Sequence, residues 1–221
     1  MLPTHLASIQ SHLEEIYQLQ NVPSIEPFVL LDTRVAEVFR TSTDKATSKL
    51  SEQLFIHNES NELLISLYLD QELLNRVEQA NPYDAISQSN LAEYCTVLEG
   101  VSHFLYLVSH VQARHSVRAI ELELQAEVDK FFGILTLCGI QAQSIEIFGL
   151  VRWLFSQIKI NKKMAPVLKR RYRLANYYAY KYCTKLLQNN MDGSGLDRDK
   201  LFKDLRYFYR LNFPQKVAHI L

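Results

Sequence analysis

Carboxylates and imidazoles recur at helical spacing in one stretch of the chain. Glu99, His103, Tyr106 and His110 follow one another at intervals of four, three and four residues, so they share one face of a helix. Carboxylates and imidazoles that project between the helices of a bundle are common metal ligands. This spacing therefore raises the hypothesis of a metal-binding enzyme or sensor.

Two long helices are expected to bring these groups together. Periodic apolar residues predict helices over residues 90–112 and 117–138, and the short connection between them predicts an antiparallel pair. If the turn centres near Arg114, Glu99 lies opposite Asp129 on the second helix. The interface would then be lined by carboxylates and imidazoles.

The predicted metal ligands are three residues of this interface: Glu99, His103 and Asp129. Di-iron bundles repeat Glu-x-x-His on two helices, whereas this chain has Glu-x-x-x-His once and no histidine on the second helix. The alternative is a buried row of mutually satisfied polar groups, with Gln125 facing His103, that fixes the register of the two helices. The sequence leaves both hypotheses open.

Charge is sorted along the chain, although the chain as a whole is neutral. Residues 1–110 carry 15 Asp and Glu against 5 Lys and Arg, a net charge of −10. Residues 111–221 carry 9 acidic and 19 basic residues, a net charge of +10, and 7 of the 12 Tyr lie after Leu150. The two halves are therefore expected to attract each other, or the basic half to attract an anionic partner.

Much of the basic charge lies on one predicted helix, over residues 163–189. One face is expected to carry five cations and a tyrosine: Lys163, Arg170, Arg173, Tyr177, Lys181 and Lys185. Such a face could bind an acidic protein, nucleic acid or another polyanion, or dock on the acidic half of the chain. No motif of a known nucleic-acid-binding module accompanies it.

Several kinds of chemistry are disfavoured by the composition. The 6 Gly are scattered and form no phosphate-binding loop, and no Ser or Cys has the setting of a catalytic nucleophile. Cys95, Cys138 and Cys183 are too widely spaced for a zinc site or a disulfide framework, so free thiols are expected. We therefore predict no catalytic residues and no cofactor.

The expected fold is mainly α, a multi-helix bundle with a small N-terminal β-hairpin at about residues 53–69, which makes it α+β by strict count. Only 6 Gly and 6 Pro interrupt the chain, which favours long helices. Two apolar runs flank the polar turn Asn58–Asn61 and predict the hairpin. A hairpin alone is marginally stable, so it must pack on helices or pair with the apolar run Phe28–Leu31.

One helical domain over residues 1–190 is expected, followed by a helical appendage over 191–221 after the linker Asn189–Gly195. The longest stretch without a charged residue, Phe131–Ile145, has 15 residues and is shorter than the roughly 20 of a membrane span. No signal peptide is recognisable, so a cytoplasmic protein is expected. The preferred function is a non-enzymatic interaction or adaptor protein, with the oligomeric state left open.

Overall fold

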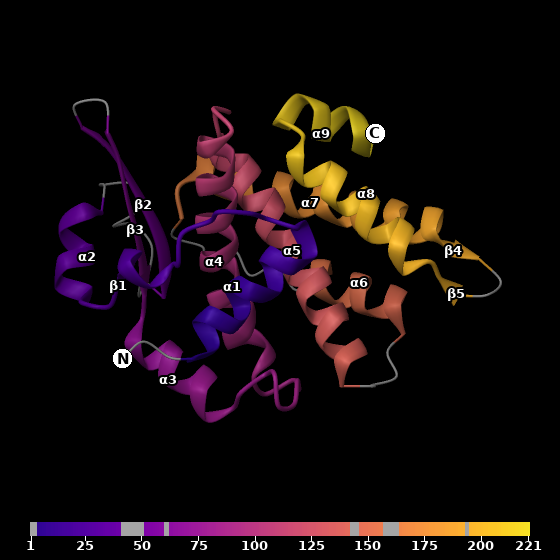
Figure 1. The fold of residues 1–221 in the computed structure, drawn as a ribbon, viewed down its shortest axis with the longest axis horizontal. Helices are drawn as coiled ribbons and strands as arrows, with labels where there is room; N and C mark the ends of the chain where they lie inside the picture. Colours follow the sequence, from indigo (N-terminus) through magenta and orange to yellow (C-terminus); the bar gives the residue numbers. More distant parts are fainter. Residues whose placement is uncertain (1–3, 41–50, 60–61, 142–145, 157–163, 193–194) are drawn as a thin grey trace.

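The computed structural model describes residues 4–40, 51–59, 62–141, 146–156, 164–192 and 195–221. Within these ranges the chain is mainly α-helical, with a small three-stranded sheet. Figure 1 shows the sheet and α2 at one end of the molecule and α7, α8 and α9 toward the other. The predicted fold class, a mainly α bundle with a small β-hairpin, is confirmed.

The elements of the N-terminal part are α1 (Thr4–Tyr17), the 3-10 turn η1 (Glu26–Phe28), β1 (Val29–Leu30), α2 (Thr33–Phe39), β2 (Glu52–Glu59), β3 (Glu62–Leu69) and α3 (Gln71–Gln79). The remaining elements are α4 (Leu91–Gln112), α5 (Ala119–Ile140), α6 (Ile147–Ser156), α7 (Pro166–Asn190), β4 (Met191–Asp192), β5 (Gly195–Leu196), α8 (Arg198–Arg210) and α9 (Phe213–Ile220).

The sheet has the strand order β1-β3-β2. It lies between α2, which packs on β1, and α4, which packs on β2 and β3. The hairpin partners β2 and β3 are antiparallel, and β1 pairs with β3 in parallel, as expected for the apolar run that contains it. Alternation along β3 directs Leu67 and Leu69 toward the main core beneath α4. Tyr68 points to the other face and packs with Ala36 of α2.

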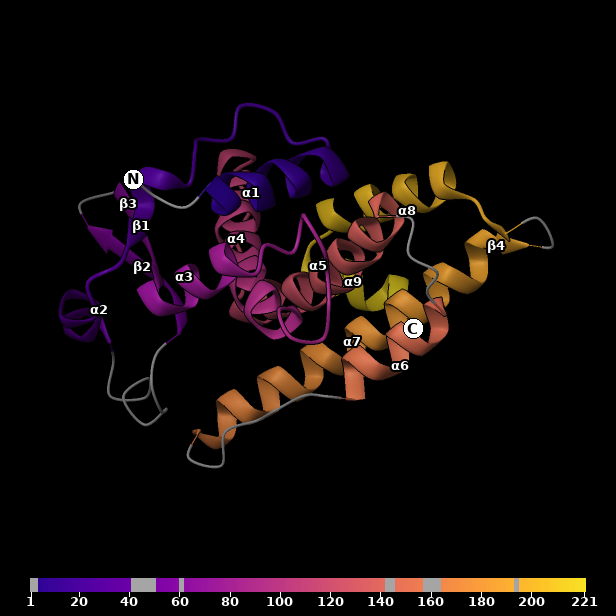
Figure 2. The same ribbon diagram turned by 90° about the horizontal axis from the view of Figure 1, so that it is seen from below.

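Helices α4 and α5 form the antiparallel pair that the short connection predicted, and they occupy the centre of the molecule (Figure 1). Helix α4 also packs on β2 and α1, and α5 packs on α6 and α7. Figure 2 shows α6 and α7 side by side along one flank. Because α4 and α5 have neighbours on several sides, most of their polar side chains are enclosed.

The C-terminal helices join the same core. Helix α8 packs on α1 and α7, α9 packs on α7, and Leu205 and Phe208 belong to the core cluster that also includes Leu13 of α1. The linker predicted over Asn189–Gly195 contains the short strands β4 and β5, and residues 193–194 lie outside the described residues. The separate status of residues 191–221 stays a prediction.

Helix α2 was not predicted from the sequence. It has only 7 residues, and its apolar residues Val35, Val38 and Phe39, which share one face, are exposed and not buried in the core. Its local signal is Asp32, whose carboxylate caps the helix by accepting from the N–H of Arg34. None of the described helices combines the length and apolarity needed to cross a membrane.

Candidate functional site

A histidine surrounded by carboxylates lies where α4, α5 and β2 meet. Nδ1 of His103 is 3.4 Å from Oε1 of Glu52, and Nε2 is 3.7 Å from Oε2 of Glu123. One ligand atom from each of Glu99, His103 and Glu123 lies within 4.8 Å of the others. The His103 side chain is only 8% exposed, and its Nε2 has no hydrogen-bond partner among the described residues.

Two cations, Lys130 and Arg171, form ion pairs with carboxylates around His103. Lys130 of α5 contacts Oε2 of Glu99 at 2.6 Å and Oε1 of Glu127 at 2.9 Å. Arg171 of α7 reaches Oε1 of Glu123 at 3.0 Å. The His103 cluster consists of seven residues from four elements: Glu52, Glu99, His103, Glu123, Glu127, Lys130 and Arg171.

The cluster shifts the pKa values of its members in linked ways. Burial alone would lower the pKa of His103, but the hydrogen bond with Glu52 and the nearby carboxylates raise it to about 9. Burial raises the pKa of Glu123 to about 7, although His103 and Arg171 oppose this shift. Buried groups whose pKa values are shifted both by desolvation and by specific charged partners are typical of functional sites.

Gly100 makes room for this arrangement. It lies inside α4, where glycine costs about 1 kcal/mol relative to alanine. A Cβ at this position would lie 2.8 Å from Cγ of Glu52 and 3.1 Å from Cδ1 of Leu67. The glycine therefore permits Glu52 to approach α4 one turn before His103.

A second buried polar group, the Lys216 network, lies farther along the α4–α5 interface. It joins five side chains that are all at most 1% exposed: Tyr17, Ser102, Gln125, Asp129 and Lys216. Asp129 accepts hydrogen bonds from the hydroxyls of Tyr17 and Ser102 and from Nε2 of Gln125. Lys216 of α9 donates to Oε1 of Gln125 at 2.6 Å.

Aromatic rings enclose the ammonium group of Lys216. Its Nζ lies 4.7 Å from the ring centre of Tyr106 and 4.4 Å from that of Phe208. Burial lowers the pKa of Lys216 to about 7, against the opposing effect of Asp129 and Glu121. Tyr106 also stacks on His110, whose pKa falls to about 4 through burial and the nearby ammonium.

The predicted metal ligands fall into both groups. Glu99 and His103 belong to the His103 cluster, whereas Asp129 is held in the Lys216 network. Glu123 takes the place beside His103 that the sequence argument gave to Gln125. Sequence reasoning missed the roles of Glu52, Arg171 and Lys216, which come from elements far apart in the chain.

The basic face of α7 consists, within the described residues, of Arg170, Arg173, Tyr177, Lys181 and Lys185; Lys163 lies outside them. All except the half-buried Lys181 are exposed. Among the described side chains, no carboxylate forms an ion pair with these four cations. Nζ of Lys185 donates to the carbonyl of His219, and Nζ of Lys181 lies 5.4 Å from the ring centre of Tyr177.

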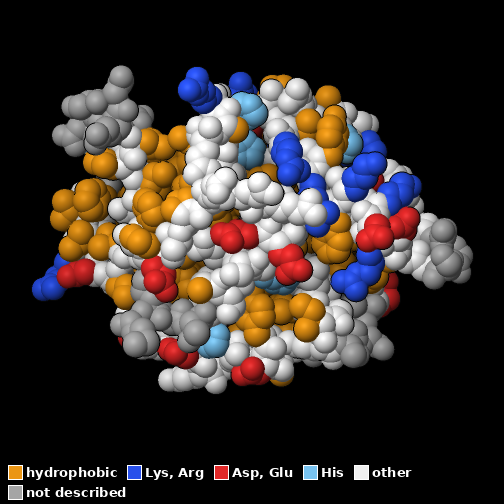
Figure 3. Space-filling model, in the orientation of Figure 1, with side chains coloured by type: hydrophobic (Ala, Val, Ile, Leu, Met, Phe, Trp, Pro, Cys, Tyr) orange, Lys and Arg blue, Asp and Glu red, His pale blue; other side chains and the backbone are white. Residues whose placement is uncertain are grey.

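Basic charge extends onto α8. Figure 3 shows Lys and Arg side chains gathered over the half of the molecule where α8 lies in Figure 1. The exposed basic residues of α8 are Arg198, Lys200, Lys203 and Arg210. Part of the basic charge of the C-terminal half thus lies on the surface of α8.

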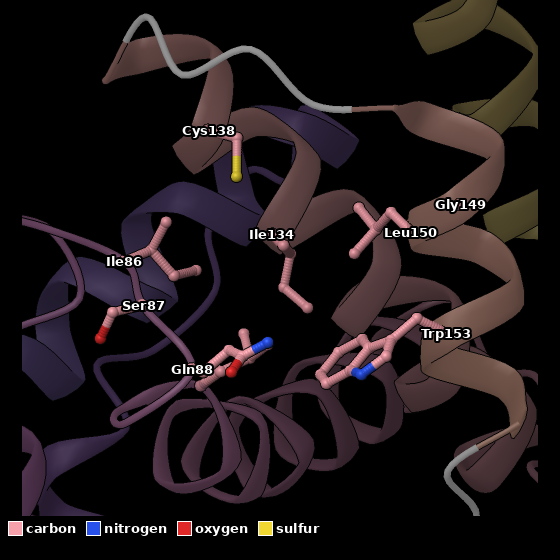
Figure 4. A pocket seen from close by; sticks show the side chains of 9 residues that line it. Ile86, Ser87, Gln88, Ile134, Cys138, Gly149, Leu150 and Trp153 are labelled. Atoms are coloured by element: carbon pink, nitrogen blue, oxygen red, sulfur yellow. The ribbon is translucent and has the colours of Figure 1, made fainter.

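Two hollows are each lined by three residues of α6. One, of about 390 Å³, lies beside the basic face and is lined by Arg152, Phe155, Ser156, Asn176, Tyr177 and Tyr180. The other, of about 300 Å³, is mostly apolar and lies between Ile86, Ile134 and Trp153 (Figure 4). No charged residue of the described part of the chain lines the second hollow, and Ser87 and Gln88 add polar groups to an otherwise apolar lining.

No family model, curated protein or solved structure matches this chain.

Proposed function

We propose that this protein is a non-enzymatic interaction protein that binds an acidic partner protein through the basic face of α7. The observation that carries the proposal is the row of exposed cations without ion-pair partners among the described residues. Charge complementarity of this kind steers association and selects partners. It also explains why the cations are arranged in one row.

A hollow lined by aromatic residues beside the cations favours a protein partner over nucleic acid. Tyr177 and Tyr180 are 48% and 40% exposed, and both line the hollow between α6 and α7. Protein interfaces are enriched in Tyr and Arg, and their binding energy concentrates where an anchor side chain fills a pocket. The expected partner surface therefore presents carboxylates around an apolar anchor.

The test begins with a photo-crosslinking amino acid in place of Tyr177 in cells, which captures the partner at this face. The captured protein is purified, and its affinity is measured by calorimetry for the wild type and for Arg170→Glu/Arg173→Glu. We expect the double variant to weaken binding by about tenfold or more, a loss of about 1.4 kcal/mol. Raising the salt concentration should weaken wild-type binding in the same direction.

The matched control is Arg114→Glu/Arg118→Glu, which makes the same charge change at the exposed turn between α4 and α5. It should leave the affinity nearly unchanged. Equal weakening by both variants would show that net charge, and not this face, controls binding. Tight binding of a single-stranded oligonucleotide at physiological salt, lost only in the α7 variant, would instead favour the nucleic-acid alternative.

A further inference from the structure

We infer that Glu99, His103 and Glu123 bind a divalent first-row transition-metal ion. The first observation is the unused nitrogen of His103. Its side chain is more than nine-tenths buried, and Nε2 is directed at Glu123 without a hydrogen-bond partner among the described residues. A buried polar atom without a partner is costly, so its persistence points to a missing ligand.

The opposite ring nitrogen is held as in metal-bound imidazoles. Nδ1 of His103 faces Oε1 of Glu52 at 3.4 Å, and a proton kept on Nδ1 lets Nε2 release its own proton to solvent and bind a metal through its lone pair. A carboxylate on the far nitrogen orients the ring and makes the metal-bound nitrogen more basic. Gly100 gives Glu52 the space to take this position.

The carboxylates are also oriented for a shared ion. Lys130 takes Oε2 of Glu99 and Arg171 takes Oε1 of Glu123, so each cation engages one oxygen of its carboxylate. The other oxygen of Glu123 lies 3.7 Å from Nε2 of His103. Two ligands on a tetrahedral ion with bonds of about 2.0 to 2.1 Å are about 3.3 Å apart, so His103 and Glu123 need only a small shift. The ligand atom of Glu99 lies within 4.8 Å of the other two and must move with its flexible side chain to complete the site.

Charge balance favours a dication. Among the described residues of the cluster, the four carboxylates of Glu52, Glu99, Glu123 and Glu127 face only two permanent cations, Lys130 and Arg171, which leaves a charge of −2 when all four carboxylates are ionised. A protonated His103 supplies one positive charge, whereas a neutral imidazole with a divalent ion supplies two. The metal would therefore neutralise the cluster.

The ligand set identifies the class of ion. One imidazole nitrogen with carboxylate oxygens suits Zn²⁺, Fe²⁺ or Mn²⁺, whereas Cu⁺ prefers thiolates or thioethers and Ca²⁺ takes six to eight oxygens. The inference does not depend on the α7 interface, because it uses the other side of that helix, where Arg171 faces inward.

The experiment uses the full chain, freed of metal with a chelator, and titrates it with Zn²⁺ by calorimetry and with Co²⁺ by visible absorption. We expect one equivalent to bind and the Co²⁺ spectrum to show bands of a low-symmetry site. Glu99→Gln should weaken Zn²⁺ binding by about tenfold or more, because it replaces a carboxylate ligand with a neutral amide and even changes beside the direct ligands cost about that much. His103→Ala should abolish binding.

Two control variants remove carboxylates that lie outside the inferred ligand set. Glu127→Gln loses a contact with Lys130 and one of the four cluster charges, so it should weaken Zn²⁺ binding much less than Glu99→Gln does. Asp129→Asn alters the neighbouring network and should bind Zn²⁺ like the wild type. If His103→Ala does not fold, the Zn²⁺ affinity of Glu99→Gln still tests the inference, because Glu99 is partly exposed and its substitution is easier to tolerate. Failure of the folded wild type to bind one equivalent, or wild-type affinity in Glu99→Gln, would overturn the inference.

Discussion

The ammonium group of Lys216 donates a hydrogen bond to Oε1 of Gln125 over 2.6 Å, and both residues are 0% exposed. Nε2 of Gln125 in turn donates to Asp129 at 2.8 Å, so a neutral amide lies between the ammonium and the carboxylate. Removing either partner would leave a buried polar group without its hydrogen bond, at a cost of about 1 to 3 kcal/mol. The last helix is thereby fastened to the central helix pair.

Lys216 should make stability depend on pH in a defined direction. In the unfolded chain the ammonium of Lys216 keeps its proton up to about pH 10.5, whereas in the folded protein it loses this proton above about pH 7. Stability should therefore rise with pH from about 7 upward, because the unfolded state binds more protons there. Relative to Lys216→Met, the wild-type unfolding free energy should increase by about 1 kcal/mol per pH unit between pH 7 and 9.

Urea unfolding at pH 7, 8 and 9 measures this difference. Lys185→Met, an exposed lysine of α7, serves as the control for substituting a lysine as such. A difference between wild type and Lys216→Met that stays constant over this range would contradict titration of the buried ammonium.

Two adjacent arginines of α7 should respond differently to charge reversal. Arg170 is exposed and has no ion-pair partner among the described residues, so Arg170→Glu should change the unfolding free energy by less than about 0.5 kcal/mol. Arg171 pairs with the buried carboxylate of Glu123, so Arg171→Glu should cost at least about 1 to 3 kcal/mol. Thermal unfolding of the two variants compares them directly.

This comparison also distinguishes the two hypotheses that the sequence left open for the basic helix. If the row that includes Arg170 were docked on the acidic half of the chain, Arg170→Glu would lower the melting temperature as clearly as Arg171→Glu does. Equal losses in the two variants would therefore count against the exposed basic face.

Gly100 and Gly139 should respond to alanine with opposite signs. A Cβ at position 139 meets nothing within 4 Å, so Gly139→Ala should stabilise α5 by up to about 1 kcal/mol. Gly100→Ala gains the same helix propensity but forces Glu52 and Leu67 to move, which should cost about 1 to 3 kcal/mol. Chemical denaturation gives both values, and a stabilising Gly100→Ala would show that Glu52 is not held tightly against α4.

The helices were predictable because their signals are local. Apolar periodicity and the short link near Arg114 were sufficient to predict α4, α5 and their antiparallel pairing. The residues of α4 and α5 that face each other were not predictable, since they depend on how each helix is rotated about its axis and on the angle at which the two cross. His103 reaches Glu123 where Gln125 was expected, and Gln125 meets Lys216 instead.

Which residues make up the His103 cluster and the Lys216 network could largely not be predicted from the sequence. Glu52, Arg171 and Lys216 lie on β2, α7 and α9, and only the tertiary fold brings them to the central helices. One signal was available: Gly100 interrupts a strongly helical stretch, and an isolated glycine there often marks a close approach by another element. That the cations of α7 share one face was predictable, because it follows from helical spacing alone, whereas the exposure of that face was not.

The Lys216 network also constrains the order of folding during synthesis. Tyr17, Asp129 and Gln125 leave the ribosome well before Lys216, so the central helices exist for a time without the cation that completes their polar contacts. Contacts between distant parts of a chain form slowly and late. The polar groups around Asp129 therefore gain the Lys216 ammonium only when α9 docks, which makes the docking of α9 a late step of folding.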